Sequence, residues 1–131
     1  MQAFSDNGIY VFLDLDTFNT QIEEDNPQWT YNQLTAFTAV IDMFRKYDNI
    51  AGFFVANEAV TRPNGTGASP WVKAAVRDIK AYLKGTSGRY IPLGYSAADI
   101  ASIRPMFQDY LVCGDIADTI DFFAVNIYEW V

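Results

Sequence analysis

The run GFFVANEAVT, residues 52–61, places a carboxamide and a carboxylate directly after an apolar strand-like segment. Residues 52–56 are small or apolar, and the segment then ends on Asn57 and Glu58. A carboxylate at the end of a buried strand is costly unless it is solvated, paired or chemically active. An amide beside a general acid can hold a sugar hydroxyl while the acid protonates a glycosidic oxygen. The pair therefore indicates either a solvated strand end or a site for glycoside cleavage.

The composition limits the other chemistries that are available. The chain has 131 residues, of which 50% are hydrophobic and 16% aromatic, as in one folded domain. It carries 16 acidic and 9 basic residues and has no run of Lys and Arg, so nucleic acid is not an expected partner. It contains no His, which excludes His-dependent triads and His-bound metals. Carboxylates remain as the expected reactive groups, without a metal or cofactor.

The sequence shows no targeting signal. No apolar run reaches the roughly 18 residues that a membrane span needs, and residues 1–10 lack a basic segment followed by an apolar one. The single cysteine, Cys113, cannot form a disulfide within the chain. These features predict either an intracellular protein or a sequence that lacks its ends.

Four nearly continuous apolar runs predict strands that are covered on both faces. They span residues 9–15, 50–57, 90–96 and 122–128. Helical patterns lie between them. A capping box formed by Thr30 and Gln33 begins a helix that is expected to stop near residues 48–49.

Two further helices are predicted from their end signals. One helix is expected to begin after Ser69 as N-cap, with Pro70 in its first turn. Gly85 is expected to cap the end of this helix. A third covers about residues 99–112, with Asp99 as the expected cap and an interruption at Pro105.

Alternating strands and helices predict an α/β fold with right-handed crossovers around a parallel sheet. An open doubly wound sheet and part of a (β/α) barrel both fit, and the sequence lacks the Gly-rich phosphate turn that would favour the former. In a barrel, the residues after each strand converge on one mouth. The polar and aromatic residues in these positions are Asp14, Asp16, Asn57, Glu58, Tyr95, Ser96, Asn126, Tyr128 and Glu129.

Four blocks of the sequence resemble, in order, the fungal 1,3-β-glucanosyltransferases of glycoside hydrolase family 72. They read YDNIAGFFVANEAV, WVKAAVRDIKAYLK, IPLGYSAADI and DFFAVNIYEW, and the resemblance extends from about Gly8 to Trp130. It implies a partial (β/α)8 barrel domain over residues 1–131, comprising strands three to six. It also implies a retaining enzyme that cleaves an internal β-1,3 bond of cell-wall glucan and transfers the chain to an acceptor glucan.

The resemblance assigns roles to individual residues. Glu58 falls on the catalytic acid/base and Asn57 on its substrate-binding partner. Tyr95 and Tyr128 are expected as sugar-stacking platforms. The resemblance also implies that Tyr128 is the strand-six tyrosine that approaches the nucleophile, against the alternative of core packing. Asp16 is a candidate for substrate contact, although DTFNTQ departs from the Asn-Thr-Pro turn that is common in the family.

Other residues receive roles outside catalysis. Glu129 is expected to be structural or solvated, and Asp99 to be a helix cap. The resemblance implies that Cys113 pairs with a cysteine outside the chain. The sequon Asn64-Gly65-Thr66 predicts N-glycosylation in an exposed loop.

The family's nucleophilic glutamate and its lipid-anchor signal are expected beyond this sequence. The isolated chain is therefore expected to be inactive, whereas the full-length protein would be GPI-anchored at the extracellular face of the plasma membrane and in the cell wall. A non-catalytic glucan-binding or interaction module and an incomplete gene model are the alternatives.

Overall fold

The structure, a computed structural model, describes residues 1–129, so Trp130 and Val131 lie outside the described residues. Four parallel strands form one sheet in the order β1-β2-β3-β4. The elements in chain order are α1 (Gln2–Asp6), β1 (Val11–Asp14), α2 (Tyr31–Phe44), β2 (Ile50–Asn57), the 3-10 helix η1 (Pro63–Ala68), α3 (Ser69–Gly85), β3 (Leu93–Ala98), α4 (Arg104–Val112) and β4 (Phe122–Asn126). The prediction of an α/β fold is confirmed.

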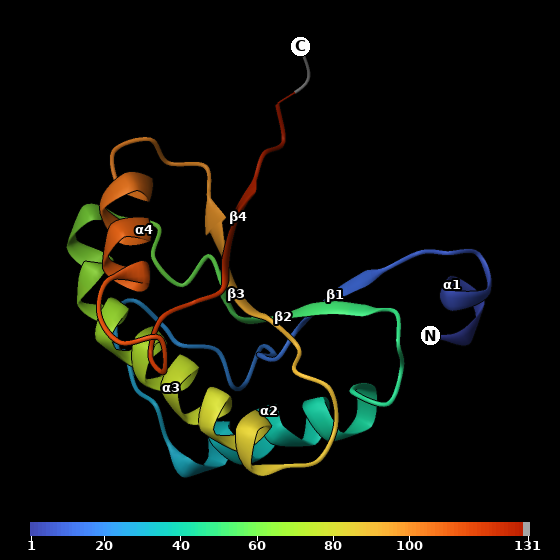
Figure 1. Cartoon of the computed structure of the whole chain (residues 1–131). Coiled ribbons are helices and arrows are strands. Elements are labelled where there is room, and N and C mark those ends of the chain that lie inside the picture. The colour runs from blue at the N-terminus through green and yellow to red at the C-terminus, as the bar shows by residue number, and fades with distance from the viewer. Residues whose placement is uncertain (130–131) are drawn as a thin grey trace.

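The helices α2, α3 and α4 lie along one side of the sheet, while α1 stands apart from them (Figure 1). The sheet adds each new strand beside the previous one, without the reversal of strand order that defines a doubly wound fold. Sequential parallel strands with helices on one face are the arrangement of a barrel segment. The carboxyl ends of all four strands consequently point to the same edge.

The beginning of α2 follows from its capping box. The Thr30 hydroxyl oxygen accepts a hydrogen bond from the Gln33 backbone N–H at 3.3 Å, and Gln33 Oε1 accepts one from the Thr30 N–H at 2.8 Å. This prediction is confirmed. The helix ends at Phe44, about four residues before the expected stop, because the chain turns at residues 45–47 to enter β2.

Two predicted helix caps are wrong. Ser69 is the first residue inside α3, and its hydroxyl donates to the carbonyl oxygen of Thr66 at 2.6 Å instead of accepting from the helix. The preceding 3-10 helix leads directly into α3, so no side-chain cap forms there. Helix α4 begins at Arg104 and not near residue 99, and Asp99 forms an ion pair with the Arg104 side chain. Pro105 lies in the first turn, where its missing N–H costs no helical hydrogen bond.

The hydrophobic core fills the space between the sheet and the helices. Alternate side chains of the strands face the helices and are fully buried, as the two-residue period of a strand requires. The fully buried side chains on strands include Phe53 and Val55 of β2 and Leu93 and Tyr95 of β3. From the helices, Phe37, Ile41, Val72, Val76, Ile79 and Leu111 pack against them.

The opposite face of the sheet is concave and carries an aromatic cluster. The rings of Phe12, Phe54 and Phe122 lie with centroids 5.2–5.7 Å apart. A Cβ atom at Gly94 would lie 2.3 Å from the Phe122 ring, so only glycine leaves room for that ring beside β3. Within residues 1–129 no helix covers this face, and Phe12 is 51% exposed.

Candidate active site

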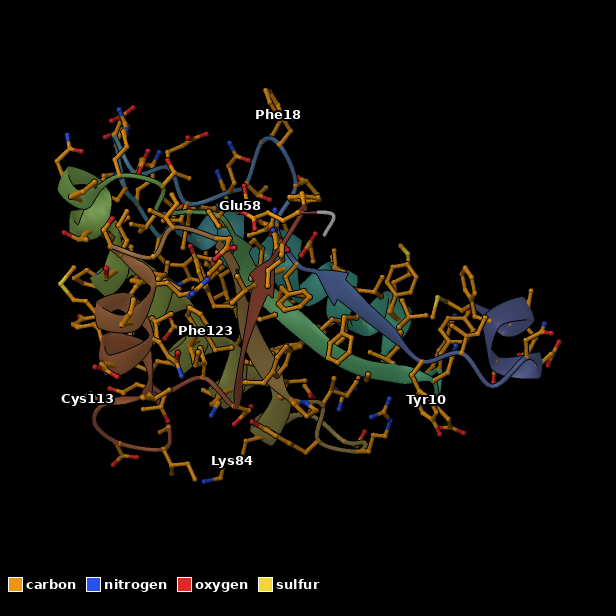
Figure 2. All side chains as sticks on the ribbon, turned by 90° about the horizontal axis from the view of Figure 1, so that it is seen from above. Tyr10, Phe18, Glu58, Lys84, Cys113 and Phe123 are labelled. Atoms are coloured by element: carbon orange, nitrogen blue, oxygen red, sulfur yellow. The ribbon has the colours of Figure 1, made fainter. Side chains whose placement is uncertain are left out.

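Glu58 lies at the carboxyl edge of the sheet, directly after β2. Figure 2 places it at one end of the sheet, whereas Lys84 lies at the other. Its backbone N–H donates to the carbonyl oxygen of Ser96 at 2.8 Å, which continues the pairing with β3 by one residue. Glu58 is the one described residue other than glycine with a positive φ, at 50°. Backbone strain of this kind occurs where a surrounding structure fixes the residue, often at functional sites.

Asn126, the last residue of β4, connects the Glu58 side chain to its neighbours. Its Nδ2 group donates to Glu58 Oε1 at 2.8 Å and to Asn57 Oδ1 at 2.9 Å. The Ser96 hydroxyl donates to Asn126 Oδ1 at 2.8 Å, which fixes the orientation of the Asn126 amide. Because Asn57 accepts through its oxygen, its own NH2 group remains as a donor. Three adjacent strands thus contribute to one polar network.

A cleft of about 240 Å³ opens beside this network. The loop after β1 forms one wall, and the segment after β2 forms the other. The lining residues are Gln21, Ile22, Glu23, Glu24, Asn57, Glu58, Ala59 and Thr61. Sites that enclose a whole ligand usually span about 300–1,000 Å³. The described cleft therefore has room for part of an extended ligand.

Asp16 is a second carboxyl group near the end of the sheet. Burial is the main reason why its pKa rises to about 6, and the nearby Asp14 carboxylate raises it further. A backbone hydrogen bond from Asn57 acts in the opposite direction. A carboxyl group with this pKa exchanges its proton near neutral pH, which is a property of acid/base groups in active sites.

The relationship of this chain to known proteins follows from its sequence and fold. Over residues 1–131 the sequence matches the glucanosyltransferase family, glycoside hydrolase family 72. The chain belongs to this family. It is 48% identical over 132 residues to 1,3-beta-glucanosyltransferase gas4 of Schizosaccharomyces pombe and 45% identical over 133 residues to 1,3-beta-glucanosyltransferase GAS5 of Saccharomyces cerevisiae. The two alignments each cover 99% of this chain but only 29% and 28% of the relatives.

The fold matches solved structures of a family 72 relative. A variant of Saccharomyces cerevisiae Gas2p in complex with laminaritetraose and laminaripentaose aligns with a TM-score of 0.93 and 40% identity. The alignment covers 98% of this chain and 29% of that protein. The prediction of a partial (β/α)8 barrel is thereby confirmed, since the four-stranded unit matches part of the Gas2p barrel.

Tyr95, expected as a sugar platform of this family 72 chain, lies in the core instead. Its side chain is fully buried, and its ring packs edge-on against Phe107 of α4 at a centroid distance of 4.7 Å. Its hydroxyl oxygen accepts a hydrogen bond from the Val60 backbone N–H at 3.2 Å. A ring without exposed surface cannot stack on a sugar, so Tyr95 has a packing role. The adjacent Ser96 points to the opposite face and contributes to the polar network.

The other predicted residues lie at the surface. Tyr128 is 81% exposed just beyond β4, and Glu129 beside it is also exposed. Asn64 is exposed on η1, where a sequon is accessible. Cys113 is an exposed free thiol at the end of α4. None of the helices within residues 1–129 is long and apolar enough to cross a bilayer.

Two residues near the cleft were not predicted from the sequence. Phe18 is 89% exposed in the loop after β1, at the same end of the molecule as Glu58 (Figure 2). An isolated aromatic residue within the polar run DTFNT was a signal that could have indicated it. Glu24 contacts the segment after Glu58 through several hydrogen bonds, and no local sequence pattern indicates that contact.

Proposed function

We propose that this chain provides the acid/base part of the active site of a retaining 1,3-β-glucanosyltransferase, with Glu58 as the acid/base residue. One observation carries the proposal. The Glu58 carboxylate lies at the carboxyl edge of a parallel barrel segment and accepts a hydrogen bond from Asn126 while a cleft opens beside it. This edge is where barrel enzymes place their catalytic groups.

Glu58 would act twice in the reaction. In the first step its carboxyl proton passes to the glycosidic oxygen of an internal β-1,3 bond, while a second carboxylate attacks the anomeric carbon, so that the glycosidic bond breaks and a sugar–enzyme bond forms. In the second step the resulting carboxylate takes a proton from the hydroxyl of an acceptor glucan, which attacks the sugar–enzyme bond. Asn126 holds the carboxylate in place, and the free NH2 group of Asn57 is positioned to donate to a sugar hydroxyl. The proton balance is restored at the end of each cycle.

A retaining mechanism needs a second carboxyl group about 5–5.5 Å from the first, to act as nucleophile. We assign this role to polypeptide outside residues 1–131, because the relatives are more than three times as long as the aligned segment. The isolated chain would then bind sugar weakly and catalyse no transfer.

The proposed substrate is β-1,3-glucan, as donor and as acceptor. Laminari-oligosaccharides occupy the Gas2p variant that shares this fold, which supports the assignment. Phe18 in the loop after β1 and Tyr128 just beyond β4 are exposed aromatic side chains with surface available for stacking on sugars. Asp16 would contact substrate from the segment that follows the neighbouring strand β1.

We extend the proposal to the full-length protein, which we expect to be GPI-anchored at the extracellular face of the plasma membrane and in the cell wall. The exposure of Cys113 and Asn64 is compatible with a disulfide to a distant cysteine and with N-glycosylation. Both modifications would be readable by mass spectrometry of the secreted protein.

A chimera tests the function. Residues 1–131 replace the aligned segment of Schizosaccharomyces pombe gas4, and transfer products from reduced laminari-oligosaccharides are measured by mass spectrometry. The chimera should transfer glucan, and Glu58→Gln should lower the rate by about 10²–10⁴-fold. Asp109→Asn on the outer surface of α4 removes the same charge and should leave the rate unchanged.

The isolated chain serves as the comparison. We expect it to bind laminari-oligosaccharides without converting them. Transfer by the isolated chain would contradict the assignment of the nucleophile. A folded, active chimera that is insensitive to Glu58→Gln would contradict the role of Glu58 and would favour a glucan-binding role for this segment.

A further inference from the structure

Glu24 forms an unusually complete set of hydrogen bonds with the segment that follows Glu58. Its Oε2 atom accepts from the Thr61 N–H at 2.8 Å and from the Arg62 N–H at 3.2 Å. Its Oε1 atom accepts from the Thr61 hydroxyl at 2.7 Å and from Arg62 Nε at 2.7 Å. Each carboxylate oxygen thus accepts two hydrogen bonds, and the side chain is 13% exposed. We call these four hydrogen bonds the Glu24 clamp.

The Glu24 clamp fits tightly against the loop. A Cβ atom at Gly65 would lie 2.1 Å from Glu24 Oε2, so only glycine permits this approach. Arg62 is held on its other side by Asp25, whose Oδ1 atom lies 2.5 Å from Arg62 Nη2. The loop after β1 is thereby joined to the loop after β2, across one side of the cleft that also contains Glu58.

The backbone around Glu58 is fixed on both sides of its strained conformation. At Glu58 itself, the backbone N–H donates a hydrogen bond to the carbonyl oxygen of Ser96. Two residues later, the Val60 backbone N–H donates to the hydroxyl oxygen of the buried Tyr95. The Glu24 clamp holds the next two residues. A residue with a φ of 50° and a side chain tends to relax to a negative φ unless its neighbours prevent it.

We propose that Glu24 is a positioning residue, which holds the segment after Glu58 and so keeps the Glu58 carboxylate directed at Asn126 and the cleft. This inference rests on the proposed function, and it assigns a role to a residue 34 positions before Glu58. Glu24 does not itself exchange a proton with substrate, because all four of its hydrogen bonds need the carboxylate as acceptor. Burial raises the Glu24 pKa, but the bonds from Thr61 and Arg62 outweigh burial and lower the pKa to about 2.

The first test measures the clamp in the chain itself and needs no activity. Glu24→Gln removes the charge and replaces one acceptor oxygen with a donor. Hydrogen exchange of the Thr61 and Arg62 amides should become at least about tenfold faster, which corresponds to the loss of one charge-assisted hydrogen bond. Glu23→Gln is the matched control, since exposed Glu23 makes no bond to residues 61–62 and should leave their exchange unchanged. Equal exchange in both variants would overturn the proposal.

The second test asks whether the clamp positions Glu58. The NMR signal of the Asn126 side-chain amide reports its contact with Glu58, and Glu58→Gln defines how far that signal moves when the contact changes. Glu24→Gln should shift the signal in the same direction, although Glu24 has no bond to Asn126. An unchanged Asn126 signal, with faster exchange at residues 61–62, would show a loop anchor without a positioning role and would overturn the inference.

The third test separates positioning from general stability. In the gas4 chimera, Glu24→Gln should lower kcat about tenfold or more and change KM less than twofold, because substrate contacts remain while the acid/base group is misdirected. Thr61→Ser retains the hydroxyl that donates to Glu24 Oε1 and should retain kcat, whereas Thr61→Val removes this donor and should lower kcat. A loss confined to KM would contradict the proposal. An inactive unsubstituted chimera would count against the proposed function. The hydrogen-exchange and NMR results would still show whether Glu24 holds residues 61–62 and positions the Glu58 side chain.

Discussion

Asn126 and Glu58 are separated by 68 residues of sequence, yet Asn126 Nδ2 lies 2.8 Å from Glu58 Oε1. The bond joins the ends of two strands that are not neighbours, because β3 lies between β2 and β4. Ser96 of β3 completes the connection by donating to Asn126 Oδ1. This contact is the feature that distinguishes Glu58 from an ordinary solvated strand-end carboxylate.

Removal of the Asn126 amide should therefore impair catalysis. Asn126→Ala in the gas4 chimera should lower kcat by about 10–100-fold, since one preorganised hydrogen bond to Glu58, the proposed acid/base residue, is lost. Ser96→Ala, which only releases the orientation of the amide, should have a smaller effect. Steady-state transfer rates would check both, and a larger effect for Ser96→Ala would contradict the proposed order of contacts.

Asp16 should make the stability of the chain depend on pH near neutrality. Its folded pKa of about 6 lies above the usual value of 3.8, so the folded state holds the Asp16 proton more tightly than the unfolded state does. Stability from this group is present below pH 4 and is lost as the pH rises through 6. Asp16→Asn should raise the free energy of unfolding at pH 7 by on the order of 1–2 kcal/mol after allowance for solvent screening. Urea unfolding at pH 5 and pH 8 would show whether the difference between variant and parent grows with pH.

Glu24 should have the opposite pH dependence. Its folded pKa of about 2 lies below the usual value of 4.5, so its contribution to stability is present above pH 4.5 and is lost as the pH falls toward 2. Between pH 5 and pH 3, Glu24→Gln should lose less stability than the parent chain. Thermal unfolding at the two pH values measures this difference, and equal losses in both proteins would contradict it.

The hydroxyl of Tyr95 should contribute to stability by accepting from the Val60 N–H. Tyr95→Phe leaves that buried donor without a partner and should cost about 1–3 kcal/mol in the free energy of unfolding. Tyr128→Phe is the matched control, since Tyr128 is 81% exposed, and it should change stability by less than about 0.5 kcal/mol. Urea unfolding of the two variants would test the core role of Tyr95 directly. Equal effects would contradict it.

The uncovered concave face should promote self-association. Phe12 is 51% exposed on β1, which has a neighbour strand on one side only among the described residues, and its ring contacts Phe54 and Phe122. Exposed aromatic surface beside an open strand edge favours association. Phe12→Ser should shift the chain toward the monomer in sedimentation velocity runs at several concentrations. Phe4→Ser on α1 removes an equally exposed ring outside this cluster and should have a smaller effect.

Local patterns in the sequence predicted the main elements of the fold. The apolar runs gave β2 with its observed bounds, and the Thr30–Gln33 capping box gave the first residue of α2. The wrong predictions concerned helix caps, where a polar side chain had more than one possible bonding partner. Ser69 bonded backward to Thr66, and Asp99 paired with Arg104, because neighbouring turns offered better geometry than a helix cap.

The sequence by itself determined that an apolar strand ends at Asn57 and Glu58 and that strands alternate with helices, since apolar runs and helix signals depend on neighbouring residues. The face to which each strand residue points was decided by the tertiary structure, which buries Tyr95 and directs Ser96 to Asn126. The Asn126 and Glu24 contacts with the segment around Glu58 were also decided there. These contacts join residues 37–69 positions apart, and their formation depends on strand register and loop closure, which no short stretch of sequence encodes.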